Sequence, residues 1–207
     1  MRKQVVIVGV GALGSHVAML LRSISDIELW LIDYDRVEQK NTQSAFFGKS
    51  NVGKLKVEAL RGQMNLLWGA QPKIETRPVK LIRDNVAELL GDADLVIDCL
   101  DNGESRRVVQ EWVRLQGFVT DAPGGRGRPA KSLLHGALAA DGAFGRVIWD
   151  EHFIPDEAGQ GAATCAGGEH LPFIGIVASW LAYAAQQFLA DGRKVGFQVS
   201  PAAMVRI

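Results

Sequence analysis

In the first 121 residues, segments whose apolar side chains have the pattern of a strand alternate with segments whose apolar side chains repeat at helical spacing. A short β-branched run at 4–8 meets Gly9, and residues 12–22 then repeat apolar side chains at helical spacing. Strands that alternate with helices favour an open sheet with helices on both faces, so we predict an α/β fold with a Rossmann-like, doubly wound sheet. The further predicted elements are strands at 27–32, 73–78, 95–99 and 118–121, and helices at 51–64, 84–90 and 104–116.

The pattern changes after residue 121. Residues 133–139 and 144–149 predict two strands paired through the turn Asp141-Gly142, and the tail at 195–207 predicts one or two short strands. Residues 171–189 predict a helix that is apolar nearly all round in its first half and is therefore buried. We expect a mostly parallel sheet with an antiparallel extension toward the C-terminus, in a single domain over residues 1–207.

Basic and acidic residues are balanced at 23 each, so the chain carries no overall field that would attract nucleic acid or an anionic membrane. We expect neither partner. The two cysteines, Cys99 and Cys165, are too few for a disulfide scaffold and fit a reducing cytoplasm. The N-terminal residues superficially resemble a signal peptide, but glycines and His16 interrupt them, and no apolar run reaches the roughly 18 residues of a membrane span.

The segment Gly9-Val10-Gly11-Ala12-Leu13-Gly14 fits the pattern GxGxxG between a strand and a helix. In such a turn Gly9 permits the tight bend, Gly11 lets the backbone approach a phosphate or ribose, and Gly14 allows close helix packing. Backbone N–H groups at the helix start, near Ala12, favour an anion. Asp33 follows about 20 residues later, where it can accept hydrogen bonds from ribose hydroxyls. The pattern predicts a nucleotide site; the alternatives are glycines that serve packing alone and a nicotinamide-dependent oxidoreductase.

A series of polar residues follows the glycine turn: Asp33-x-Asp35, Asn41, Gly53-x-x-Lys56, and then Asp98-x-x-Asp101-Asn102 with Arg106. This order resembles the ThiF/HesA/MoeB family, the ubiquitin-activating-enzyme-like adenylyltransferases. The resemblance covers nearly the whole chain, because Cys165 and the apolar helix at 171–189 look like the family's crossover-loop cysteine and the long helix after it.

The resemblance implies a reaction that uses ATP and Mg²⁺. The C-terminal carboxylate of a ubiquitin-like or sulfur-carrier protein, or of a peptide, attacks the α-phosphate and gives an acyl-adenylate and pyrophosphate. The enzyme needs no base because the nucleophile is already a carboxylate, so positioning and charge compensation can carry the catalysis. The resemblance also implies a homodimer.

By the same resemblance, Asp33 would hold the ribose, Lys56 would supply positive charge to the triphosphate, and Asp101 would coordinate magnesium. Asn41 would add a neutral donor near the phosphates. The implied nucleotide-binding residues are Gly9, Gly11, Ala12, Gly14, Asp33, Asp35, Lys56 and Leu100.

Several of these residues have structural alternatives. Asp98 is better explained as a cap of the following helix. Arg106 either positions the nucleotide loop or forms an ion pair on its own helix, and we favour the ion pair. Lys54 and Lys56 can be solvated residues of a helix's first turns, although lysine there opposes the helix dipole. Asp101 and Asp35 can likewise serve only as a cap and a loop contact.

The loop predicted at 151–169 contains Cys165, for which the resemblance leaves two roles, an acyl acceptor or an inert thiol. Cys99 lies in an apolar run and is expected to pack. The two CxxC pairs that bind zinc in many relatives are absent, so we expect no structural zinc. His16 and His135 are expected to be ordinary, partly buried residues.

The phosphate-binding arginine of the family is missing. Where relatives usually carry N-x-x-R-Q, this chain has Asn41-Thr42-Gln43-Ser44-Ala45, with Ser44 at the arginine position. Each hydrogen bond to a charged group is worth about 1.5–3 kcal/mol, so the loss matters unless another cation substitutes. Arg36, Arg126, Arg128 or an arginine from a second protomer are the candidates. Without a substitute, the chain is a weak or inactive scaffold or regulatory protein that binds nucleotide or a carrier protein.

Overall fold

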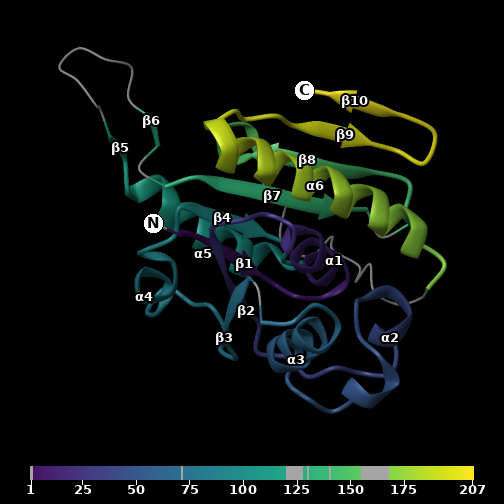
Figure 1. The fold of residues 1–207 in the computed structure, drawn as a ribbon. Coiled ribbons are helices and arrows are strands. Elements are labelled where there is room, and N and C mark those ends of the chain that lie inside the picture. The colour runs from purple at the N-terminus through teal and green to yellow at the C-terminus, as the bar shows by residue number, and fades with distance from the viewer. Residues whose placement is uncertain (1, 71, 120–127, 130, 140, 155–167) are drawn as a thin grey trace.

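The computed structural model describes residues 2–70, 72–119, 128–129, 131–139, 141–154 and 168–207. An eight-stranded sheet runs through them in the order β10-β9-β8-β7-β4-β1-β2-β3 (Figure 1). The mutually parallel strands are β1 (Lys3–Val8), β2 (Ile27–Ile32), β3 (Lys73–Arg77), β4 (Leu95–Asp98) and β7 (Leu133–Leu138). The antiparallel strands are β8 (Gly145–Trp149), β9 (Phe197–Val199) and β10 (Met204–Arg206). The predicted mixed sheet with an antiparallel C-terminal extension is confirmed.

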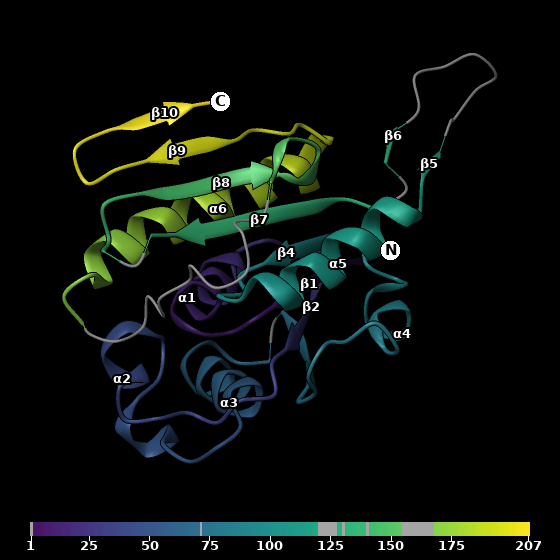
Figure 2. The same cartoon turned by 180° about the vertical axis from the view of Figure 1, so that it is seen from behind.

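Helices cover both faces of this sheet. On one face lie α1 (Ala12–Leu21), α3 (Lys56–Trp68) and α6 (Leu171–Asp191), and on the other lie α4 (Val86–Leu90) and α5 (Gly103–Leu115), as Figures 1 and 2 show. Buried residues accordingly form two clusters. Val5 and Ile7 of β1 belong to one and Val6 and Val8 to the other, because successive side chains of a strand point to opposite faces. The predicted doubly wound arrangement is confirmed.

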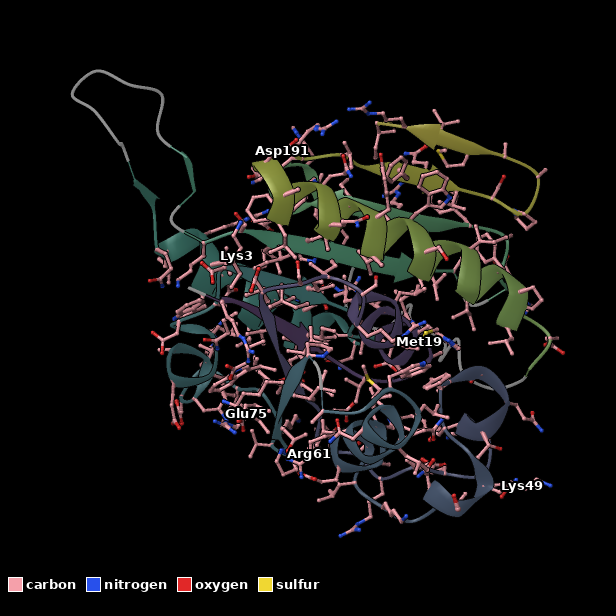
Figure 3. The ribbon with its side chains drawn as sticks, in the orientation of Figure 1. Lys3, Met19, Lys49, Arg61, Glu75 and Asp191 are labelled. Atoms are coloured by element: carbon pink, nitrogen blue, oxygen red, sulfur yellow. The ribbon has the colours of Figure 1, made fainter. Side chains whose placement is uncertain are left out.

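Helix α6 crosses the sheet beside α1 and is largely apolar. Among the described residues it is the one helix long and apolar enough to cross a membrane, yet half of its most apolar window is buried inside the fold. At its C-terminal end the Lys3 ammonium donates to the carbonyl of Leu189, which places a positive charge where the helix dipole favours one (Figure 3). In this arrangement α6 serves as a core helix.

The predicted helix at 51–64 is wrong at its start. The chain first forms a short helix α2 (Asn41–Ser44) and a 3₁₀ helix η1 (Lys49–Asn51), and α3 begins at Lys56. Gly53 has a φ of +87°, and Arg36 forms an isolated antiparallel bridge with Leu55. Because the chain turns back to pair Leu55 with Arg36, just after β2, helix α3 begins only at Lys56.

The predicted strand at 118–121 does not join the main sheet. Its described part, β5 (Phe118–Val119), pairs with β6 (Arg128–Pro129) in a separate two-stranded sheet, visible as a projection in Figure 1. Strand β7 occupies the position beside β4, where Val96 pairs with Leu133, and β1 occupies the other side of β4. Both edges of β4 are therefore filled by other segments; residues 120–121 lie outside the described part.

Candidate active site

A pocket opens at the carboxyl ends of β1, β2 and β4, the edge of an open α/β sheet where ligands usually bind. Its walls come from the glycine turn, the end of β2, the start of α3 and the turn after β4, segments that are distant in the sequence. Residues singled out from the sequence that line it are Gly9, Gly11, Ala12, Asp33, Asp35, Lys56, Cys99, Leu100, Asp101, Asn102 and Arg106, whereas Gly14 is not among the lining residues.

The three glycines of the turn have different surroundings. Gly9 has a φ of +84°, and a Cβ there would lie 2.9 Å from the carbonyl oxygen of Cys99. A Cβ on Gly14 would lie 1.9 Å from the carbonyl oxygen of Gly9, so α1 can pack against the turn only without a side chain at this position. A Cβ on Gly11 would meet nothing within 4 Å. Gly9 and Gly14 thus serve the fold, whereas Gly11 leaves open space at the pocket.

Asp33 joins the end of β2 to the glycine turn. Its carboxylate accepts hydrogen bonds from the backbone N–H groups of Val10 and Asp35, each at 2.9 Å. Burial raises the pKa of Asp33, and the nearby Lys56 ammonium opposes this rise. The carboxylate is therefore fixed in direction at the pocket wall before any ligand binds.

Lys56 is the first residue of α3 and is paired with Asp35. Its Nζ lies 2.8 Å from Oδ2 of Asp35, and its side chain is 11% exposed. The backbone N–H of Lys56 also donates to the carbonyl of Asp35 at 2.9 Å. A lysine at a helix N-terminus opposes the helix dipole, and the Asp35 carboxylate offsets that cost. These contacts direct an ammonium group to the pocket.

The turn after β4 places Asp101 at the pocket rim and buries Asp98 beneath it. The N-cap of α5 is Asn102, whose Oδ1 accepts from Ser105 N–H at 2.8 Å, so the prediction that Asp98 caps this helix is wrong. Asp98 is the last residue of β4 and is fully buried, four positions before the helix cap. It accepts instead from the N–H of Leu100 at 2.9 Å. Asp101 is exposed and lines the pocket.

Asn41 and Ser44 are not among the residues that line the pocket. Oδ1 of Asn41 accepts a hydrogen bond from the N–H of Glu38 at 2.8 Å, which stabilises the turn before α2. Ser44 is fully buried, and its hydroxyl has no hydrogen-bond partner among the described residues. The His16 ring, whose pKa is lowered by burial, contacts the Ser44 carbonyl at 3.1 Å. The role given to Asn41 stays a prediction.

Of the candidate substitutes for the missing arginine, the structure describes only the side chain of Arg36. Arg36 donates to the carbonyl of Gly53 at 2.8 Å and is not a lining residue. Arg126, the side chain of Arg128, and Cys165 lie outside the described part of the structure. Cys99 is partly buried against the core, as expected for packing, and burial raises the pKa of its thiol.

A buried charge network under the pocket was missed from the sequence. His135 of β7 is fully buried, not partly buried as expected, and lies between two carboxylates. Its Nδ1 is 2.6 Å from Asp98 and its Nε2 is 3.1 Å from Asp150. Arg106 adds a second cation, and the prediction that it pairs on its own helix is wrong, because its Nε lies 2.8 Å from Asp98 of β4. A single histidine in an apolar strand gives no periodic signal of such partners, since they come from β4, α5 and η2 (Asp150–His152).

Residues 1–195 match the sequence model described as the ThiF family. This chain belongs to the ThiF family. Among the similar ThiF-family proteins, the molybdopterin-synthase adenylyltransferase of Escherichia coli (strain K12) is 28% identical over 204 residues, which cover 90% of this chain and 73% of the relative. The ubiquitin-like modifier-activating enzyme 5 of Drosophila ananassae is 34% identical over 119 residues, or 52% of this chain and 30% of the relative. The resemblance inferred from the motifs is confirmed.

Solved structures show the same ThiF-type fold. The structure of E. coli MccB with ATP has a TM-score of 0.72 at 15% identity and covers 99% of this chain but 62% of MccB. PaaA has a TM-score of 0.71 at 19% identity and covers 99% of this chain and 63% of PaaA. The chain thus spans less than two thirds of each of these proteins. At such identities the likeness establishes the fold alone.

Proposed function

We propose that this chain catalyses ATP-dependent adenylation of the C-terminal carboxylate of a ubiquitin-like or sulfur-carrier protein, or of a peptide. The observation that carries the proposal is the pocket at the ends of β1, β2 and β4, which gathers the glycine turn, Asp33, Lys56 and Asp101. The names of several relatives support it, since they are adenylyltransferases or modifier-activating enzymes.

The lining residues suit a nucleoside triphosphate. The open space at Gly11 and the N-terminus of α1 favour a phosphate, and the Asp33 carboxylate is an acceptor for ribose hydroxyls. Lys56 lines the same pocket and is the cation proposed for the triphosphate. The described residues contain no group of three or more histidine, cysteine or acidic side chains that could hold a metal. Asp101, which lines the pocket, would hold Mg²⁺ together with phosphate oxygens and water, as is usual for this ion.

In the proposed reaction an oxygen of the incoming carboxylate forms a bond to the α-phosphorus, and the bond from that phosphorus to the bridging oxygen of pyrophosphate breaks. Negative charge moves onto pyrophosphate, so Lys56 stabilises the departing group where its charge develops. Bound Mg²⁺ would supply further charge compensation to the phosphates. Asp33 and the glycine turn hold the nucleoside so that the α-phosphate faces the carboxylate.

The test is pyrophosphate exchange with ATP, Mg²⁺ and a panel of small proteins and peptides that end in glycine. We expect labelled pyrophosphate to enter ATP with at least one carrier and not without a carrier, because the carboxylate is the nucleophile. NADH should show no binding. Absence of exchange across the panel, with the folded protein confirmed by circular dichroism, contradicts the proposed activity.

A second candidate is a nucleotide- or carrier-binding protein without turnover. The observation that favours it is the small number of cations: the described lining residues include Lys56, Lys80 and Arg106, and Arg106 is engaged with the Asp98 carboxylate. Ser44, at the family's arginine position, is buried away from the pocket. Calorimetry that shows ATP binding together with exchange assays that show no turnover would select this candidate.

The same proposal leaves two roles for Cys165. Either the acyl group is transferred from AMP to the Cys165 thiol, or this thiol is inert. Intact-mass measurement of a thioester, lost in Cys165→Ser, separates the two roles.

We also propose that the protein is a cytoplasmic homodimer. Helix α6 would contribute Ile176 and Tyr183 to the interface, since these residues are 43% and 41% exposed. Light scattering tests the assembly.

A further inference from the structure

The charge network beneath the pocket has a central histidine with a carboxylate at each ring nitrogen. A neutral imidazole carries one N–H, so one of its two nitrogens would present a lone pair to a carboxylate oxygen at 2.6 or 3.1 Å. The doubly protonated ring donates to both. Its face also stacks on Phe153 with ring centroids 3.9 Å apart, a contact that favours a cation. The surroundings therefore select the imidazolium form of His135.

The same carboxylate connects His135 to the pocket. Oδ2 of Asp98 contacts both His135 Nδ1 and Arg106 Nε, while Oδ1 accepts from the N–H of Leu100. Arg106 donates in turn to the carbonyls of Leu100 and Gly136, and both residues line the pocket. The backbone on two sides of the pocket is thus held through one buried carboxylate and its two cations.

The other carboxylate connects His135 to α5 and η2. Oδ1 of Asp150 accepts from Gln110 at 2.6 Å, and Oδ2 lies 2.8 Å from Nε of Arg114. Gln110 and Arg114 also donate to the carbonyl of Phe153. Through these hydrogen bonds, the segment from Asp150 to Phe153, which precedes residues 155–167 in the chain, is part of the network that supports the pocket.

We propose that His135 is a positioning residue for nucleotide binding: its imidazolium joins Asp98 to Asp150 and, through Asp98 and Arg106, holds Leu100 and Gly136 in place. This role rests on the proposed nucleotide site. The charged groups in contact with the ring are Asp98 from β4 and Asp150 from η2, and these carboxylates in turn contact Arg106 and Arg114 of α5. Loss of the ring proton leaves Asp98 with Arg106 as its remaining cation in the described network and loosens both backbone contacts.

The network predicts a pH dependence of defined sign. Burial alone would lower the pKa of His135, but the hydrogen bonds to Asp150 and Asp98 outweigh it and raise the pKa above 6.5. Its contribution is therefore complete below pH 6.5 and is lost as the pH rises through the pKa of the folded protein. Arg106 and His135 lower the pKa of Asp98 despite its burial. His135 and Arg114 likewise lower the pKa of Asp150, so neither acid titrates in this pH range.

The experiment measures the Kd for ATP from pH 6 to 9 by calorimetry for the wild-type protein and for His135→Gln. We expect His135→Gln to raise Kd on the order of tenfold at pH 6, with the ratio of variant to wild-type Kd falling toward one at high pH. The protonation of ATP changes both Kd values by the same factor, so its effect cancels in the ratio. His152→Gln, a change of an exposed histidine on η2, is the matched control and should keep the ratio at one throughout.

Two further measurements keep the test decisive if His135→Gln folds poorly. Asp150→Asn removes one carboxylate and should move the pH midpoint of ATP binding to lower pH. In the wild-type protein, ¹⁵N NMR should show both ring nitrogens of His135 protonated at pH 6.5. A neutral ring there, or a constant Kd ratio in folded His135→Gln, overturns the positioning role. Absence of ATP binding by the wild-type protein overturns the proposed function, and the dependent role of His135 with it.

Discussion

Replacing Lys56 by alanine is expected to slow ATP–pyrophosphate exchange by about 10²- to 10³-fold, as removal of one group that stabilises developing charge usually does. The Lys56 ammonium is held at the pocket by Asp35 at 2.8 Å, and its side chain is mostly buried. The substitution therefore removes a charge from a fixed point, and the other described lining cations, Lys80 and Arg106, belong to different segments. Exchange rates at saturating ATP and Mg²⁺ measure the effect.

Lys54 provides the matched control for this prediction. It lies two residues earlier, is exposed, and is not a lining residue, so Lys54→Ala should exchange at the wild-type rate. Lys56→Arg keeps the charge but spreads it over a planar group, and should recover part of the activity. Equal losses in the two alanine variants, or a wild-type rate in Lys56→Ala, would rule out the role given to Lys56.

The variant Gly14→Ala should lose about 3 kcal/mol or more of stability, a large effect for one methyl group. Its Cβ would lie 1.9 Å from the carbonyl oxygen of Gly9 and 3.1 Å from Cβ of Cys99. The nearer atom is backbone, so relief requires α1 to move away from the turn after β1. Urea unfolding followed by circular dichroism measures the change in the free energy of unfolding.

Gly11→Ala makes the same chemical change three residues earlier, where a Cβ would meet nothing within 4 Å. We expect its free energy of unfolding to stay within about 0.5 kcal/mol of wild type. ATP affinity should fall, because the methyl group occupies space at the pocket that the proposed phosphate needs. A stable Gly14→Ala protein would show that α1 is not held as closely as the structure describes.

Most regular elements could be predicted from the sequence because their signals are local. The strand at 27–32 was predicted with the bounds of β2, and the glycine turn lies between β1 and α1 as its pattern required. The errors arose where contacts between distant segments decide the path. Leu55 pairs with Arg36, and α3 begins only at Lys56. The described part of the strand predicted at 118–121 pairs with β6 and not with the main sheet.

The sequence by itself determined the doubly wound sheet, the glycine turn and the order of acids and lysine that marks the ThiF family, because periodicity and motif spacing are properties of the chain. Only the tertiary structure decided which of those residues meet in one pocket, and that Asn41 and Ser44 are not among its lining. It also decided that His135 lies between Asp98 and Asp150. Asp98 and Asp150 lie 37 and 15 residues from His135 along the chain. The burial and the charged partners of His135 therefore depend on distant segments, which the local sequence pattern does not reveal.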